Sequence, residues 1–346
     1  QRGAVTSERF ELGRNFCNKL WNASRFALTN LEGYRDAPAT DVTGSLKIED
    51  RWLLSRLATV TREVTDALQL YRYADAARAL YDFAWNEFCS FYVEMTKSRF
   101  ADEGPDKQVA QSVLAHGLDT LLRLLHPMTP FLTEEVWQLL GEVAPLRRLT
   151  SPARQTVSPA RQTAAPSICI APWPTVNEAD SDPQIEAQFA VFQSVLGAVR
   201  EVRQSQGIAW TETLEFVVRC DDQTAGLLQP MTPYFAQMAK ASPAAMGPAA
   251  TAPDIAASRS LAVAGSEAIE VHVDISGFID VEAEKKRLGK ERDQKAKFVK
   301  GLEGKLSNEK FVANAPAAVV EEQRAKLEEA RQAIASIEAS LAKLDS

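Results

Sequence analysis

The sequence is short of the residues that most often build a catalytic or metal centre. Among its 346 residues there are three histidines, which lie in unrelated segments: His116, His126 and His272. There are four cysteines, which lie far apart: Cys17, Cys89, Cys169 and Cys220. No two cysteines have the spacing of a metal site or of a disulfide framework. The pattern therefore predicts no metal site, and reduced thiols of this kind are typical of a cytoplasmic protein.

Catalytic motifs are also missing. The sequence contains no glycine-rich phosphate loop, no HExxH pair and no nucleophile elbow. The acidic residues are scattered, and Glu134 and Glu135 suit the first turn of a helix because the helix dipole favours negative charge there. His126 precedes Pro127 at an expected helix end, where we expect it to act as a structural cap. The sequence therefore predicts no catalytic residue in this chain.

Membrane segments and an overall basic charge are absent as well. No apolar run is long enough to span a membrane, and there is no secretory signal. With 46 acidic against 39 basic residues the net charge is -7, so any nucleic-acid binding must depend on local patches. The sequence does not begin with methionine, and we expect it to be part of a longer protein.

What the sequence does contain, over residues 1–145, is a series of helical patterns that predicts an antiparallel helical bundle. Five segments carry apolar residues at helical steps. The stripes are Phe16, Leu20, Ala23 and Ala27; Leu53, Leu57, Val60, Val64 and Leu68; Leu80, Ala84, Phe88, Phe91 and Met95; Val113, Leu118, Leu121 and Leu125; and Leu132, Val136, Leu139 and Leu140. Thr129 and Pro130 suit the cap and the first position of the fifth helix.

The first of these helices carries a second, polar face without any carboxylate. Its residues are Arg14, Asn15, Asn18, Lys19, Asn22 and Arg25. Arginine and amide side chains can reach the phosphates and base edges of unpaired RNA, and nearby aromatic rings can stack on bases. We therefore take these six residues as candidate RNA-binding residues. A solvated helix face has the same pattern, so the spacing alone leaves both interpretations open.

The composition changes after residue 145. Residues 146–182 are predicted to be a linker, with a mobile surface loop that repeats SPARQT and a short strand, SICIAPWP, ended by prolines. Residues 183–276 are predicted to form a small α+β domain, with one helix before the strand-like runs LEFVVRC and AIEVHVDI. Within it, the Pro/Ala-rich segment SPAAMGPAATAPDIAAS is expected to be a connection without regular structure.

Residues 277–346 are predicted to form an antiparallel coiled-coil hairpin. Two sets of apolar residues recur at steps of seven: Val320, Leu327, Ile334 and Leu341, and Ala330, Ile337 and Leu344. A rougher seam lies upstream, at Val281, Leu288, Val299, Leu302 and Leu306. Asn314 and Pro316 break the helix between them. Three glycines, Gly289, Gly301 and Gly304, each cost about 1 kcal/mol relative to Ala, and are expected to make the first arm less rigid.

Positive charge is concentrated on the first arm of this hairpin. Residues 285–310 contain ten Lys and Arg against four Asp and Glu, whereas residues 316–346 contain four against six. This one-sided excess favours a polyanion partner. The candidate RNA-binding residues here share one side of the helix: Lys286, Lys290, Lys297 and Lys300. Solvated coiled-coil flanks are the alternative explanation.

Three segments together resemble a known family. GRNFCNKLWNASRF at 13–26, followed by HPMTPFLTEEVWQ at 126–138, resembles the anticodon-binding helical domain of class I aminoacyl-tRNA synthetases for valine, isoleucine and leucine. The tail that begins IDVEAEKKRL at 279 is similar to the C-terminal coiled-coil arm of the bacterial valyl-tRNA synthetases, an arm that the isoleucine and leucine enzymes lack. By this resemblance, the chain is identified as the C-terminal part of that family.

The resemblance implies a tRNA partner, expected to be tRNA(Val), with anticodon reading by residues 1–145 and contact with the tRNA elbow by residues 277–346. It implies that ATP and Mg are used by a catalytic domain whose His-Ile-Gly-His-like and Lys-Met-Ser-Lys-Ser-like motifs are missing here, as is the editing domain. This chain alone is therefore expected to be inactive and to need no cofactor. A cytoplasmic monomer without membrane contact is expected.

Two alternatives stay open at this point. One is a fragment of isoleucyl-tRNA synthetase, which a zinc-binding cysteine cluster near the C-terminus would favour, but the tail has no cysteine. The other is a helical coiled-coil scaffold that binds a protein partner instead of RNA.

Overall fold

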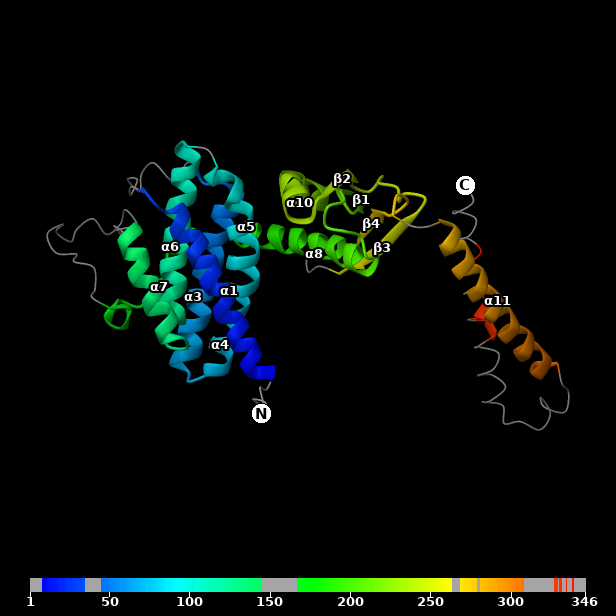
Figure 1. The fold of residues 1–346 in the computed structure, drawn as a ribbon, viewed down its shortest axis with the longest axis horizontal. Helices are drawn as coiled ribbons and strands as arrows, with labels where there is room; N and C mark the ends of the chain where they lie inside the picture. The colour runs from blue at the N-terminus through cyan, green and yellow to red at the C-terminus, as the bar shows by residue number, and fades with distance from the viewer. Residues whose placement is uncertain are drawn as a thin grey trace, which may run out of the picture. The chain divides into compact units, whose positions relative to one another are not determined.

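The structure is a computed structural model that describes most of the chain (Figure 1). The described residues are 8–34, 45–101, 103–144, 167–262, 268–278 and 281–307, together with 327, 328, 330, 331, 334 and 338. The SPARQT repeat lies outside them. The chain divides into two compact units, residues 1–193 and residues 194–346. It is mostly helical, with one small four-stranded mixed sheet in the second unit.

The first unit is a set of packed helices. Its α-helices are α1 (Glu8–Asn30), α3 (Ile48–Gln69), α4 (Tyr73–Asp82), α5 (Val93–Thr96), α6 (Pro105–Leu125) and α7 (Pro130–Val143). Its shorter elements are η2 (Phe83–Tyr92), η3 (Lys97–Phe100), η5 (Ile168–Ile170) and η6 (Glu178–Asp180). Helices α1 and α3 both lie alongside α6 (Figure 1). The first half of α8 (Pro183–Ser205) also belongs here, and Phe189 on it stacks on Trp52 of α3 with ring centroids 4.4 Å apart.

The predicted apolar stripes form the core of this unit. Leu20, Leu53, Val64, Leu118 and Val136, from four different helices, are each at most 1% exposed. Burying a side chain of this size stabilises the fold by roughly 1.5–3 kcal/mol. A few residues at the edges of the stripes are only half-buried: Ala23, Leu68, Phe91, Leu132 and Leu139. The sequence prediction of a helical bundle core is therefore confirmed.

The third predicted helix is wrong in detail, because it is not one regular α-helix. Its middle, η2, is a π-helix of ten residues between α4 and α5. Buried side chains here recur at steps of both five and four, as at Phe83, Phe88 and Tyr92, which fits a turn wider than that of an α-helix. The hydroxyl of Ser90 likewise donates to the carbonyl of Trp85, five residues earlier. The prediction used the α-helical period and missed this wider turn.

A buried ion-pair network ties the end of this helix to the start of α3. The guanidinium of Arg99 in η3 lies 2.9 Å from Oε1 of Glu49 and 2.8 Å from Oδ2 of Asp50, and both carboxylates are fully buried. The hydroxyl of Tyr92 donates to Asp50 at 3.0 Å, and Asp106 at the start of α6 lies 2.8 Å from Arg99. Three segments of the chain therefore meet at one buried cation.

Helix α7 begins where the sequence predicted. Thr129 occupies its N-cap position and Pro130 its first position. The side chain of Thr129 does not cap the helix, however, because its hydroxyl donates back to the carbonyl of Leu125 at 3.4 Å.

The segment SICIAPWP is not the predicted short strand. Residues Ile168–Ile170 form a 3₁₀ turn instead. The side chain of Ser167 accepts a hydrogen bond from the backbone N–H of Cys169 at 3.2 Å, and the N–H of Ile168 donates to Glu134 at 3.1 Å. Local side-chain acceptors thus satisfy N–H groups that a strand would have paired with a neighbouring strand.

The second unit holds the sheet and the helices around it. Its elements after α8 are β1 (Leu214–Arg219), α9 (Asp222–Leu228), η7 (Gln229–Met231), α10 (Thr232–Ala239), β2 (Ala241–Met246), β3 (Ala256–Leu261), β4 (Ile269–Asp274) and α11 (Val281–Leu306). The strand order is β2-β1-β4-β3, with β1 and β2 parallel and the other pairs antiparallel. Phe216 of β1 packs edge-on against Phe235 of α10, with centroids 5.1 Å apart. Strands β1 and β4 are the two that the sequence predicted.

The Pro/Ala-rich segment, predicted to be an irregular connection, contributes two strands instead. Residues 242–246 of it lie in β2 and residues 256–258 lie in β3, the two edges of the sheet. Ala, Ser and Pro have low strand propensity, which is why the pattern was missed. Pro243 is tolerated because it lies on an edge strand beside a register shift opposite Phe216 and Val217.

Helix α11 runs without interruption through Gly289, Gly301 and Gly304, the glycines that were expected to weaken it. Leu302 on it is 3% exposed, whereas Val299 and Leu306 are half-buried. The other side chains of the upstream seam, Val281 and Leu288, lie outside the described set. In the part of the chain that the structure describes, none of the helices is both long and apolar enough to cross a membrane.

Candidate nucleic-acid interface

The polar face predicted on the first helix is a real surface of α1. Five of its six residues are exposed: Arg14, Asn15, Asn18, Asn22 and Arg25. The opposite stripe anchors the helix, with Phe16, Leu20 and Ala27 buried against the bundle. Among the described residues, neither Arg14 nor Arg25 forms an ion pair. Their charges are therefore available to an incoming anion.

Lys19 is the sixth predicted residue, and the structure turns it away from that surface. Its Nζ donates to the hydroxyl of Ser90 at 2.6 Å and lies 4.0 Å from the ring centroid of Trp85, both in η2. Burial lowers the pKa of Lys19, although the neighbouring Cys89 and Glu94 partly oppose this. Lys19 thus joins α1 to η2, while the other five residues face solvent.

An exposed aromatic side chain lies within the same face and was missed in the sequence. Trp21 is 38% exposed, and it follows Asn18 by three residues and precedes Arg25 by four. Since residues three and four apart are neighbours on a helix, Arg14, Asn18, Trp21 and Arg25 form one line. At 1.5 Å rise per residue this line is about 16 Å long. The helical spacing could have identified Trp21 in the sequence, but the prediction considered only the polar residues.

Three other aromatic rings near α1 stack on one another, whereas Phe10 at the start of the helix is 75% exposed. Phe16 stacks on Tyr81 of α4 with centroids 5.3 Å apart, and Tyr81 stacks on Trp85 at 5.7 Å with an interplanar angle of 8°. These half-buried or buried rings hold α1 against the π-helix. Trp21 is therefore better placed than these stacked rings to stack on a base.

The basic residues predicted on the coiled-coil arm lie on α11. Lys290, Lys297 and Lys300 are exposed, whereas the side chain of Lys286 lies outside the described residues. Arg292 forms an ion pair with Asp293, which follows it directly. The three described lysines present positive charge along residues 290–300 of one helix.

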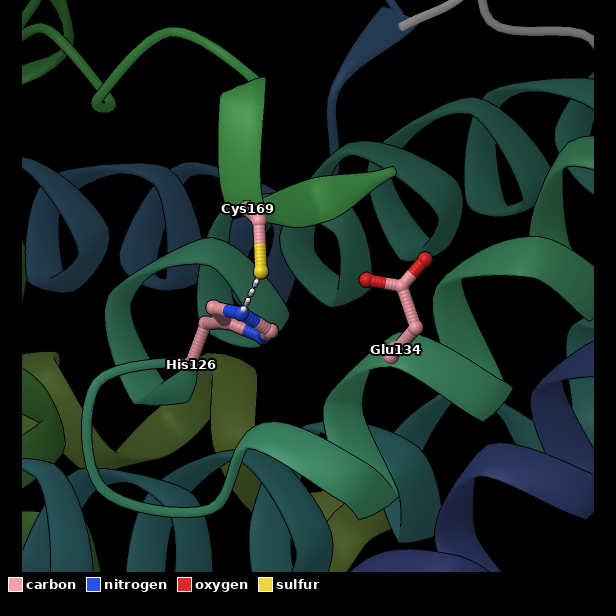
Figure 2. A group of neighbouring side chains, drawn as sticks. All are labelled: His126, Glu134 and Cys169. Carbon is pink, nitrogen blue, oxygen red and sulfur yellow. Dashed lines mark hydrogen bonds between the residues drawn. The ribbon is translucent and has the colours of Figure 1, made fainter. Parts of the chain in front are cut away.

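One group of side chains in the described part of the chain is suited to bind a metal ion. It consists of His126, Glu134 and the more distant Cys169, which lie together in the first unit (Figure 2). His126 sits at the C-cap of α6, as the sequence predicted for a capping residue, and its Nδ1 lies 2.8 Å from the hydroxyl of Thr133. The sequence spacing gave no sign of this group.

Comparison with known protein families matches two parts of the chain. Residues 50–218 match a family described as the anticodon-binding domain of tRNA ligase, and residues 280–345 match the valyl tRNA synthetase tRNA binding arm. Helix α11 and the part of the first unit from residue 50 onward fall within these ranges, whereas α1 lies before the matched anticodon-binding range. Together they define the tRNA-binding part of an aminoacyl-tRNA synthetase.

The relatives specify which synthetase. The valine–tRNA ligase of Rhodopirellula baltica is 47% identical over 345 residues, that of Geobacter sulfurreducens 36% over 343 residues, and that of Enterococcus faecalis 33% over 321 residues. These alignments cover 100%, 98% and 92% of the chain but only 32%, 36% and 33% of the three relatives. The chain belongs to the valyl-tRNA synthetase family and spans about a third of the length of these relatives.

The matches favour this family over the isoleucine enzyme and over a coiled-coil scaffold. Neither matched domain is catalytic, which agrees with the missing synthetase signature motifs. The two matched family models are thus described by anticodon and tRNA binding and not by catalysis.

Proposed function

We propose that this chain is the tRNA-recognition portion of a valine–tRNA ligase that works as a cytoplasmic monomer. Its helical unit reads the anticodon of tRNA(Val), and its C-terminal arm contacts the tRNA elbow. The ATP- and Mg-dependent chemistry is assigned to a catalytic domain outside this sequence. The two matched domains and the relatives support the proposal. The observation that carries its molecular detail is the exposed line of Arg14, Asn18, Trp21 and Arg25 on α1.

This line has the chemistry that unpaired RNA requires. Guanidinium groups bind phosphates, the amide of Asn18 can both donate to and accept from a base edge, and an exposed indole can stack on a base. No carboxylate lies between Arg14 and Arg25 to repel phosphates. An anticodon loop is single-stranded and presents splayed bases, so it is the part of a tRNA that such a surface suits best.

The arm is proposed to be an antiparallel coiled-coil hairpin, and two interactions support this. Nη2 of Arg331 lies 2.7 Å from Oε1 of Glu303 near the end of α11. The pKa of Arg292 is raised by its hydrogen bond to Asp293 and further by the carboxylate of Glu338. Along α11 the residue number therefore falls from 303 to 292, while along the facing segment it rises from 331 to 338. Opposite directions of this kind are the signature of an antiparallel pair.

The buried residues of the arm fit the same register. Leu302 is 3% exposed and Ala330 is 5% exposed, while Lys290, Lys297 and Lys300 remain exposed on α11. In the proposed hairpin the apolar seam joins the two helices and the lysines face outward. Counterion release from the tRNA backbone then makes their contribution salt-dependent and independent of sequence.

The anticodon assignment is tested with the double variant Arg25→Ala and Trp21→Ala. Loss of one stacked base costs roughly 1–3 kcal/mol, or about 5- to 150-fold in affinity for tRNA(Val). Affinity for a tRNA with a changed anticodon should fall less. A matched control is Arg78→Ala, an exposed arginine on α4. Equal affinities of the double variant and the control would contradict the assignment.

The arm is tested by changing Lys290, Lys297 and Lys300 to Gln together. Binding of tRNA(Val) and of noncognate tRNA should weaken by similar factors. The slope of log affinity against log salt should flatten by ~0.7–0.9 for each lost phosphate contact. An unchanged slope would contradict the role of the arm, whereas a changed discrimination between tRNAs would contradict its sequence independence.

A further inference from the structure

His126, Glu134 and Cys169 come from three different elements that converge at one corner of the first unit. His126 ends α6, Glu134 lies in the first two turns of α7, and Cys169 lies in the 3₁₀ turn η5. One candidate ligand atom from each residue lies within 4.8 Å of the other two. Figure 2 shows the thiol above the imidazole ring and one carboxylate oxygen of Glu134 turned toward both.

The imidazole of His126 is held in the tautomer that a metal ligand needs. The hydroxyl of Thr133 donates to the carbonyl of Thr129 at 2.9 Å, so it accepts from Nδ1 of His126 at 2.8 Å. Nδ1 therefore carries the ring proton, and the lone pair of Nε2 points at the sulfur of Cys169, 3.1 Å away. Histidine ligands in metal sites donate their second ring N–H to a fixed acceptor in this same way.

The carboxylate of Glu134 is also positioned by several donors. Its Oε2 accepts from the hydroxyl of Ser167 at 2.9 Å and from the N–H of Ile168 at 3.1 Å, while Oε1 accepts from the amide of Gln138 at 2.7 Å. A carboxylate oxygen has two lone pairs, so Oε1 can still accept another partner. The same contacts hold η5 against α7.

The donor set identifies the class of ion. A thiolate and an imidazole are ligands that suit Zn²⁺, whereas Mg²⁺ and Ca²⁺ prefer oxygen ligands only. In a tetrahedral zinc site with Zn–N of ~2.0 Å and Zn–S of ~2.3 Å, ligand atoms lie roughly 3.5 Å apart. Side-chain shifts on the order of 1 Å would bring the present group to that geometry.

We propose that His126, Glu134 and Cys169 bind one Zn²⁺ ion, with the fourth position open to water. Cys169 is exposed and the other two residues are half-buried, so the site lies at the surface and the ion can enter from solvent. The bound ion fastens η5 to the corner between α6 and α7. The proposal does not depend on the assignment of tRNA binding.

A simple hydrogen bond from the thiol to Nε2 is the alternative, and metal binding separates the two. Chelator-treated chain is titrated with Zn²⁺ by calorimetry and with Co²⁺ by absorption spectroscopy. The unmodified chain should bind one ion, and Co²⁺ should give thiolate charge-transfer and tetrahedral d–d bands. Cys169→Ser should lose the charge-transfer band and bind Zn²⁺ at least about tenfold more weakly. Cys17→Ser, a control at a half-buried cysteine outside this group, should behave like the unmodified chain.

Thr133→Val is the second test, because it removes the acceptor for Nδ1, together with the hydrogen bond to the carbonyl of Thr129, and nearly preserves shape. It should weaken Zn²⁺ binding by roughly 10- to 100-fold while Cys169 remains in place. Circular dichroism confirms that both variants fold. Failure of the unmodified chain to bind Zn²⁺, or equal binding by Cys169→Ser, overturns the proposal and leaves the thiol–imidazole hydrogen bond as the explanation of the group.

Discussion

Replacing Arg99 by Met should strongly destabilise the first unit. Arg99 is the cation between two fully buried carboxylates, Glu49 and Asp50, at 2.9 and 2.8 Å. Met fills a similar volume but removes the positive charge of Arg99 from both carboxylates. The hydroxyl of Tyr92 and the backbone N–H of Lys47 still donate to Asp50, and these neutral donors cannot replace a guanidinium.

The expected loss follows from the burial of the pair. Removing one partner of a buried ion pair costs roughly 3–5 kcal/mol, because the remaining charge stays desolvated and unpaired. For a compact unit of this size, 1 kcal/mol shifts the melting temperature by about 2–4 °C. The Arg99→Met variant should therefore melt roughly 6–20 °C below the unmodified chain. The melting temperature of Arg99→Lys should lie between those of Arg99→Met and the unmodified chain, since a lysine keeps the charge but lacks the planar guanidinium.

Thermal unfolding followed by circular dichroism measures this difference, with Arg62→Met as the matched control. Arg62 pairs with Glu178 at 2.9 Å, but the two side chains are 42% and 76% exposed. Exposed pairs contribute about 0–1 kcal/mol, so this control should melt within a few degrees of the unmodified chain. Equal melting temperatures for the Arg99 and Arg62 variants would refute the reasoning from burial.

Two further predictions concern Glu186 and Lys19. Burial alone would raise the pKa of Glu186, but hydrogen bonds from Ser55, Arg56 and Thr59 hold this pKa below its usual value. The ionised Glu186 therefore stabilises the fold fully above the usual glutamate pKa of about 4.3, and this stabilisation is lost as the pH falls through the lowered pKa. The melting-temperature advantage of the unmodified chain over Glu186→Gln should therefore shrink from pH 6 to pH 3, and a constant difference would contradict it. Lys19→Met should keep tRNA affinity within about twofold of that of the unmodified chain, because Lys19 faces η2. A loss of affinity as large as that of Arg25→Ala would show instead that Lys19 contacts RNA.

The helical part of the fold was predictable because its apolar residues keep a helical period over long segments. Leu53, Val64 and Val136 are buried as that period requires. Strands β1 and β4 were equally readable, since LEFVVRC and AIEVHVDI consist of residues that favour a pleated sheet. Strand β2 was not, because Ala and Pro form strands only when a neighbour such as β1 supplies the pairing.

The candidate sites were predictable only where one element supplies them. Arg14 and Arg25 lie on a single helix, so spacing located them on one face. The fate of Lys19 depended on Trp85 and Ser90, 66 and 71 residues further on, whose position no local pattern encodes. Cys169 reaches His126 only because η5 folds back on α7, and a short 3₁₀ turn leaves no periodic signal.

Because η2 is a π-helix, the number of residues in it determines how the side chains after it are oriented. Each of its turns contains more residues than the 3.6 of an α-helix. The ten residues from Phe83 to Tyr92 therefore determine the direction around the helix axis in which the side chains of η3 point. Loss of one residue there would rotate the downstream chain about the helix axis, by somewhat less than the roughly 100° per residue of an α-helix. Arg99 would then point away from Glu49 and Asp50, although the residues next to it in the sequence would be unchanged. Insertions and deletions in this short apolar stretch should accordingly be tolerated far less well than substitutions.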